Sequence, residues 1–157
     1  MNKVLTSLTV LALFLFTLSA YAGTPAEILM HKYEEAKGIS FVEAKGVSMK
    51  LARVMIRKTP AAPVADKITE VSVLKMEDAD DKIRSDFHNN LKVTLKQYTY
   101  VGKSKAANGD VVDVYISQPE KDTIYEMVIF NSEKYILNSL RGQIPFSLLQ
   151  SMQEQIL

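Results

Sequence analysis

Hydrophobic side chains in the middle of the chain recur at the spacing of one helix face. Successive members lie four residues apart, so that each stands about one turn from the last. They are Ile83, Phe87, Leu91 and Leu95. The acidic run 78–81 comes directly before them, and carboxylates favour the unpaired N–H groups at a helix start. The pattern predicts the longest helix of the chain, with one buried face.

A second helix is predicted near the start of the chain from its capping signals. Thr24-Pro25-Ala26-Glu27 has the form of a capping box, in which Thr24 accepts from the amide of Glu27 and the glutamate reaches back. Proline at the first helical position loses no hydrogen bond. Gly38 suits the residue just after the helix end.

Two shorter helices follow from similar signals. One begins after Ser48 and ends at the proline-containing segment 59–63, because proline cannot continue a helix. Its inner face is predicted to carry Leu51, Val54 and Met55. Pro145 is predicted to open a C-terminal helix whose inward side chains are Leu148, Leu149 and Met152.

The remaining apolar runs predict about six strands. They cover residues 39–44, 68–76, 98–105, 111–117, 124–130 and 134–140. Asn108-Gly109 is a strong signal for a hairpin turn, and Ser132-Glu133 predicts a second tight turn. Four consecutive strands without a helix between them exclude a strictly alternating parallel fold. We therefore expect an α+β domain with one mostly antiparallel sheet, a C-terminal four-stranded meander, and helices packed on the sheet.

The first 22 residues have the three parts of a secretory signal peptide. Lys3 gives a positive start, residues 4–18 form an apolar run, and Ala20-Tyr21-Ala22 is a small-x-small cleavage signal before Gly23. A membrane anchor is the alternative, but the apolar run is shorter than a spanning helix and ends at the cleavage signal. We expect cleavage after Ala22, so that residues 23–157 form one exported, soluble domain in the periplasm or outside the cell.

Composition excludes several classes of function. The chain has 19 basic and 18 acidic residues, and a formal charge of +1 lacks the basic surplus of a nucleic-acid binder. It has no Cys, which excludes disulfides, thiolate metal sites, Cys nucleophiles and a lipid anchor on a lipobox cysteine. We expect no cofactor, no metal and no membrane span after signal cleavage.

Motifs that could carry chemistry are isolated. Ser72-Val73-Leu74-Lys75 matches a Ser-x-x-Lys pattern, but that pattern needs a helical turn and here lies in a predicted strand. Asp78, Asp80 and Asp81 suit a helix start better than a calcium loop, which needs a glycine and a distant glutamate. His31 and His88 fall on different predicted helices. We interpret each of these as structural or surface residues.

The meander carries an aromatic pattern that is the best candidate for a partner-binding surface. With a two-residue turn at Asn108-Gly109, Val101 pairs with Ile116 and Lys103 pairs with Val114. Tyr100 and Tyr115 then share the face away from Val112, Val114 and Ile116, which are expected to line the core.

In the second hairpin, the predicted turn pairs Phe130 with Tyr135 and Val128 with Leu137. The predicted partner surface consists of Tyr100, Tyr115, Phe130 and Tyr135. The alternative is that a helix covers this face, since tyrosine is common in strands.

The order of these elements resembles a known family of exported proteins from Bacteroidota. The opening helix with Leu29-Met30-His31-Lys32-Tyr33 is followed by Gly38-Ile39-Ser40, and later by Ile68-Thr69-Glu70-Val71 and the meander 111–140. This arrangement is similar to the family called domain of unknown function 4252. The resemblance implies a small domain in the envelope of a Gram-negative bacterium with a link to envelope signalling, and implies no site residues.

Two functions from different classes remain open. The first is an exported, non-catalytic domain that binds a protein or an envelope component. The second is a small periplasmic hydrolase acting on envelope material, with a carboxylate such as Glu70 or Glu126 as its acid or base. A hydrolase should show a concave pocket with convergent titratable groups, whereas a binding domain should show an accessible surface without them.

Overall fold

The computed structural model describes residues 23–58, 61–105 and 108–150. Its helices are α2 (Pro25–Tyr33), α3 (Met49–Ile56) and α4 (Asp81–Leu95), with short 3-10 segments η1 (Gly46–Ser48) and η2 (Ala62–Lys67). Its strands are β1 (Ser40–Lys45), β2 (Ile68–Lys75), β3 (Thr99–Lys105), β4 (Val111–Ile116), β5 (Thr123–Asn131) and β6 (Ile136–Pro145). The predicted signal peptide, including Ala20 and Ala22, lies outside the described residues, as does Met152.

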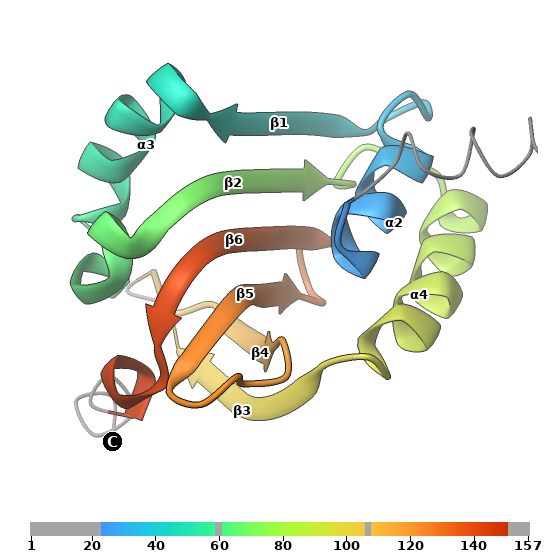
Figure 1. Ribbon diagram of the computed structural model, residues 1–157. Coiled ribbons are helices and arrows are strands. Elements are labelled where there is room, and N and C mark those ends of the chain that lie inside the picture. Colours follow the sequence, from blue (N-terminus) through green and yellow to red (C-terminus); the bar gives the residue numbers. More distant parts are fainter. Residues whose placement is uncertain (1–22, 59–60, 106–107, 151–157) are drawn as a thin grey trace, which may run out of the picture.

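The six strands form one open antiparallel sheet in the order β1-β2-β6-β5-β4-β3 (Figure 1). The last strand in the described residues, β6, therefore lies inside the sheet and joins β2 to β5. The run β3-β4-β5-β6 is the expected C-terminal meander. The predicted α+β fold with a mostly antiparallel sheet is confirmed.

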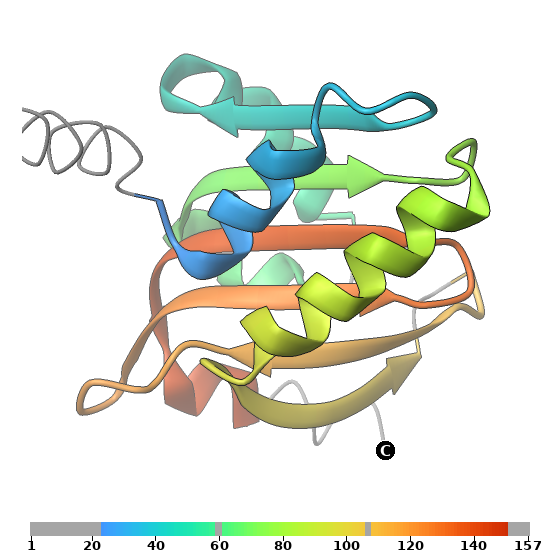
Figure 2. The same cartoon turned by 90° about the vertical axis from the view of Figure 1, so that its right-hand side faces the viewer.

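Both faces of the sheet carry a hydrophobic core, because alternate residues of each strand point to opposite sides. Helices α2 and α4 cover one face (Figure 2), where Met30 and Phe87 pack with Leu74, Val128 and Leu137 of the sheet. On the other face lie α3, η2 and the helical residues 146–150. The buried residues of these segments pack against sheet side chains that point to this second face, such as Met127 and Leu140.

The helix starts follow the predicted capping chemistry. Thr24 accepts from the amide of Glu27, whose carboxylate accepts from the amide of Thr24, completing the capping box of α2. Asp80 accepts from the amide of Ile83 (2.8 Å) at the start of α4. Phe87 and Leu91 are buried, as the stripe predicts.

The predicted inner face of α3 is wrong. Leu51, Val54 and Met55 are exposed, whereas Met49, Ala52 and Ile56 pack against the core. The apolar side chains of this short helix lie on several of its sides, so its sequence allows more than one buried face. Arg53 fixes its rotation by donating to the carbonyl of Ile68 from Nε and Nη2 (3.2 and 3.0 Å).

Both predicted hairpin registers are wrong. Tyr100 pairs with Tyr115, because a bulge between Tyr100 and Gly102 and a loop longer than two residues shift the pairing. In the second hairpin Phe130 pairs with Leu137. The side chain of Asn131 accepts from two amides of the following turn, which lengthens that turn to four residues. The second shift is even, so the side chains of β5 and β6 keep their predicted faces.

Candidate functional site

A polar cluster lies where the start of α2 crosses the sheet. Arg141 on β6 pairs in register with Glu70 on β2 and with Glu126 on β5, so three neighbouring strands place these side chains together. The same face of these strands is apolar further along, at Leu74, Leu137 and Val128. A register shift lies beside Glu70 and another beside Glu126, in each case on the side of the glutamate away from the apolar end.

Glu126 is enclosed by hydroxyl groups. Only 2% of its surface is exposed. One carboxyl oxygen accepts from Thr24 Oγ1 (2.8 Å) and Ser139 Oγ (2.6 Å), and the other accepts from the Tyr98 hydroxyl (2.7 Å). These contacts tie α2, β5, β6 and the segment after α4 to a single buried side chain.

Arg141 connects two further carboxylates. Its Nη1 atom lies 2.8 and 3.0 Å from the two oxygens of Glu27 and 2.8 Å from Glu70. Burial acts to lower the pKa of Arg141, but the hydrogen bond and charge of Glu27, and then the charges of Glu70 and Glu126, raise it above its usual value. The guanidinium is therefore held in its charged form by three acidic neighbours.

Tyr98 closes the cluster from the other side. Burial, followed by its hydrogen bond to Glu126 and the negative charge of that group, raises the pKa of Tyr98 well above its usual value. The phenol also accepts from the amide of Ala26 (3.1 Å), one of the free N–H groups in the first turn of α2. Tyr98 thus stays protonated and links the helix start to Glu126.

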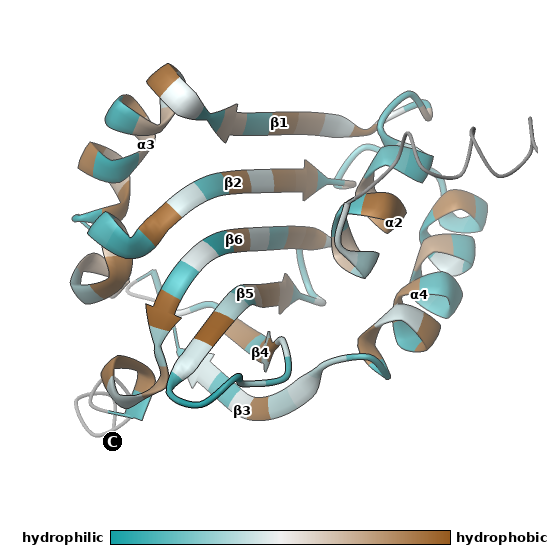
Figure 3. Ribbon diagram, viewed as in Figure 1, coloured by the Kyte–Doolittle hydropathy of each residue, from teal (hydrophilic) through white to brown (hydrophobic). Residues whose placement is uncertain are grey.

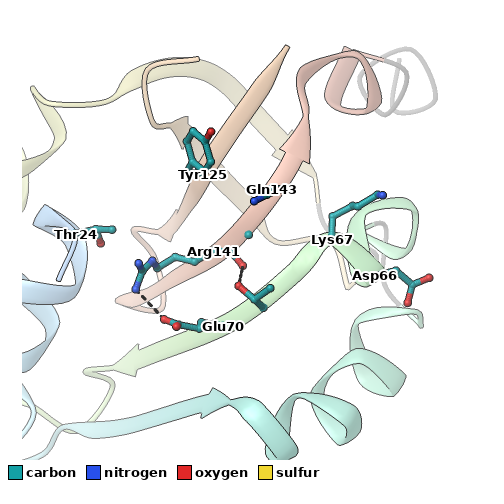
Figure 4. Close-up of a pocket in the computed structure, with 9 residues that line it drawn as sticks. Thr24, Asp66, Lys67, Glu70, Tyr125, Arg141 and Gln143 are labelled. Carbon is teal, nitrogen blue, oxygen red and sulfur yellow. Dashed lines mark hydrogen bonds and ion pairs between the residues drawn. The ribbon is translucent and has the colours of Figure 1, made fainter. Parts of the chain in front are cut away.

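An open cleft of about 480 Å³ borders the cluster. Its lining residues are Thr24, Asp66, Lys67, Thr69, Glu70, Tyr125, Arg141, Gly142 and Gln143. Figure 4 shows Arg141 and Glu70 directed toward each other, with Tyr125 and Gln143 further along the cleft. Glu126 does not line it. The cleft therefore presents one edge of the polar cluster, a tyrosine ring and an amide to a ligand.

The four aromatic residues predicted as a partner surface lie in different surroundings. Tyr100 is 51% exposed, its ring centroid lies 5.0 Å from that of Tyr115, and its hydroxyl donates to Asp113 (2.9 Å). Tyr115 is half-buried against the core beneath α4. Only this pair comes together on the surface.

Phe130 and Tyr135 are not part of an exposed surface with that pair. Phe130 is 4% exposed and packs near Phe87 of α4, so its predicted exposure is wrong: α4 covers this end of the sheet. Tyr135 occupies the β5–β6 turn with a φ of 51°, and the guanidinium of Arg84 lies over its ring. The burial of Phe130 depends on where α4 crosses the sheet, and the pattern of apolar residues along the strands does not indicate that position.

The isolated motifs stay apart in the structure. Ser72 is buried and Lys75 is exposed on β2, as expected for strand residues three apart. His31 forms a hydrogen bond with Glu34 (2.7 Å) at the end of α2, and His88 on α4 lies beside Phe130. Within residues 23–58, 61–105 and 108–150, no three acidic or histidine side chains are grouped to hold a metal.

Sequence reasoning singled out Glu70 and Glu126 but missed their partners Glu27, Tyr98 and Arg141. A charged residue in the middle of an apolar strand run, such as Arg141 after Leu140, was the available signal.

No helix in the described part of the chain is long and apolar enough to cross a bilayer. Comparisons with family models, curated proteins and solved structures found no match for this chain.

Proposed function

We propose that this chain is an exported, non-catalytic envelope domain that binds a protein or an envelope component in the cleft beside Arg141. The observation that carries the proposal is the accessible lining of the cleft. Tyr125 is 45% exposed there, next to Arg141 and Gln143. Tyrosine and arginine are the residue types that contribute most often to binding energy at interfaces.

The positions and hydrogen-bond partners of the Glu126 and Glu70 carboxylates favour binding over hydrolysis. A general acid or base must come within hydrogen-bond reach of the reacting group. Glu126 lies behind the cleft and is occupied by three hydroxyl donors, and Glu70 is held by Arg141. The cluster thus supports the cleft wall. The hydrolase alternative would act through Glu70, the acidic side chain of the cluster that does line the cleft.

Export and the envelope location belong to this proposal. They rest on the three-part pattern of residues 1–22 and on the resemblance to domain of unknown function 4252. The resemblance also motivates a link to envelope signalling. The pair Tyr100 and Tyr115 is kept as a second candidate contact, because the Tyr100 ring is exposed on the edge strand β3.

Site-specific photocrosslinking in living cells tests the proposal. A photoreactive amino acid replaces Tyr125 in the cleft, Tyr100 in the aromatic pair, or Val93, which is 63% exposed on α4 and serves as the control. We expect discrete adducts from position 125 that position 93 does not give. Adducts from position 100 alone would move the binding site to the aromatic pair, and identical patterns from all three would contradict binding.

A second arm addresses the hydrolase alternative. The purified protein is incubated with isolated envelope material, and released fragments are measured for the parent, Glu70→Gln and Tyr125→Ala. We expect no release by any of them. Release by the parent that Glu70→Gln abolishes would replace the binding proposal with catalysis.

A further inference from the structure

The outward face of η1 and α3 is apolar and uncovered in the described structure. Val47 is 83% exposed, Leu51 71%, Met55 66% and Val54 48%. The opposite side of the helix already packs on the core through Met49, Ala52 and Ile56. Figure 3 shows hydrophobic residues along α3, which lies on the other side of the sheet from α2 and α4. We call these four residues the α3 face.

The segment around the α3 face is basic. Residues 44–65 contain no Asp or Glu, although acidic and basic residues are nearly balanced over the whole chain. Their basic residues are Lys45, Lys50, Arg53, Arg57 and Lys58. Arg53 is turned inward, Lys45 contacts Glu43, and Arg57 contacts Asp66. Lys50 and Lys58 are exposed, and neither has an acidic partner within the described residues.

We propose that the α3 face docks on an anionic phospholipid surface. A helix with apolar residues on one side and lysines beside them lies in the plane of a membrane interface. The apolar side chains enter the boundary between headgroups and acyl chains, while the cations remain among the phosphates. The exposed side chains of α3 and of the turn after it match both requirements: Leu51 and Met55 for insertion, Lys50 and Lys58 for the headgroups.

Charge also decides against the other occupants of such a face. A second copy of this chain would bring two basic segments together, and like charges repel across an interface. A nucleic acid would pair with the lysines but would leave Val47 and Leu51 without an apolar environment. Peripheral docking needs no spanning segment and no lipid modification. It is independent of the cleft, so either proposal can fail alone.

Vesicle flotation tests this inference. The full chain is produced in cells, its N-terminus is read by intact mass, and it is mixed with vesicles of phosphatidylcholine or of phosphatidylcholine with phosphatidylglycerol. We expect flotation with the phosphatidylglycerol vesicles only, weakening as salt is added. Because the chain has no Trp, Leu51→Trp supplies a reporter whose emission shifts to shorter wavelength on insertion.

Matched variants separate the α3 face from the rest of the surface. Leu51→Asp and Lys50→Glu should each weaken vesicle binding by about tenfold or more, through lost insertion and lost headgroup attraction. Val93→Asp and Lys92→Glu make the same changes on exposed positions of α4 and should bind like the parent. Met55→Asp replaces Leu51→Asp if the latter does not fold, as judged by its melting curve.

Three results would overturn the inference. The first is equal binding to both kinds of vesicle, or to neither. The second is a Leu51→Asp or Met55→Asp variant that binds like the parent. The third is a dimer in solution that Leu51→Asp dissociates, because the α3 face would then be occupied by a second copy.

Discussion

At the scale of single residues, Glu126 is a buried carboxyl group whose direct partners are hydroxyls and not cations. Burying such a group is unfavourable unless hydrogen bonds replace those it made with water. Thr24, Tyr98 and Ser139 provide three, at 2.6–2.8 Å. The same three hydroxyls depend on Glu126 as their acceptor, so the group and its neighbours stabilise one another.

Replacing Glu126 should therefore destabilise the whole domain. We expect Glu126→Ala to lower the free energy of unfolding by about 3 kcal/mol, because it leaves three hydroxyls without an acceptor and opens a void. Glu126→Gln should cost less, since it keeps the shape and one acceptor oxygen. Urea unfolding measures both. Exposed Glu133→Ala is the control, expected within about 0.5 kcal/mol of the parent; a Glu126→Ala variant as stable as this control would contradict the role of the cluster.

Tyr33 gives a pH dependence with a defined sign. Burial, then its hydrogen bond to Asp86 and the charge of Asp86, raise the pKa of Tyr33 from 10.0 to about 12, while Asn90 acts in the opposite direction. The folded state thus favours the protonated phenol. Its contribution to stability is complete below pH 10 and is lost as the pH rises toward 12.

Urea unfolding across that pH range tests the sign. The free energy of unfolding of the parent should fall more steeply with pH than that of Tyr33→Phe, which has no phenol to ionise at this position. Tyr125→Phe removes the hydroxyl of an exposed tyrosine and is measured beside it as the comparison variant. Parallel slopes for the parent and Tyr33→Phe would show that folding does not perturb Tyr33.

At the scale of elements, the sequence predicted which segments form helices and strands better than it predicted which side of each element is buried and in which register the strands pair. The stripe of α4 and the capping box of α2 are local signals, and the structure follows them. The rotation of α3 depends on Arg53 reaching the carbonyl of Ile68, fifteen residues away. The register of β3 and β4 depends on a bulge beside Gly102, and a glycine inside a strand, which often marks a bulge, was the local signal that the prediction did not use.

The contact between η2 and β6 should be sensitive to one added methyl group. A Cβ atom at Gly142 would lie 1.9 Å from the carbonyl oxygen of Lys67, so the two segments could not approach as they do. We expect Gly142→Ala to lower the free energy of unfolding by about 2 kcal/mol or more. Gly46→Ala is the comparison, because its Cβ meets nothing within 4 Å and only its positive φ opposes the change, costing about 1 kcal/mol. Equal losses in thermal melts would mean that the close approach does not limit the packing.

At the scale of the whole molecule, the order of elements was enough to predict an antiparallel sheet with helices on it, because consecutive strands tend to be neighbours. The polar cluster was beyond that reasoning. Glu27 and Glu70 are far from Arg141 in sequence, and Glu70 meets Arg141 only because β6 enters between β2 and β5. Charge and hydropathy mark such residues as unusual for strands, but not as neighbours.

The proposed export leads to a prediction about the molecule as it is isolated. The protein recovered from the periplasm or medium should begin at Gly23, because Ala20 and Ala22 provide the small residues that signal peptidase requires. Intact-mass measurement of that fraction checks the cleavage position. Replacing Ala22 by a large residue should retain the precursor in the membrane fraction, and a mature protein with residues 1–22 still attached would contradict export by this route.

The inner position of β6 also sets the order in which the chain can fold. A chain that emerges from its N-terminus first can form the antiparallel pair β1–β2, helix α4 and the β3–β4 hairpin before β6 is present. The two halves of the sheet have no shared edge until residues 136–145 arrive. Pairing β2 with β6 closes a loop of more than sixty residues, a slow step for a polypeptide. The sheet can therefore be completed only after residues 136–145 have been synthesised.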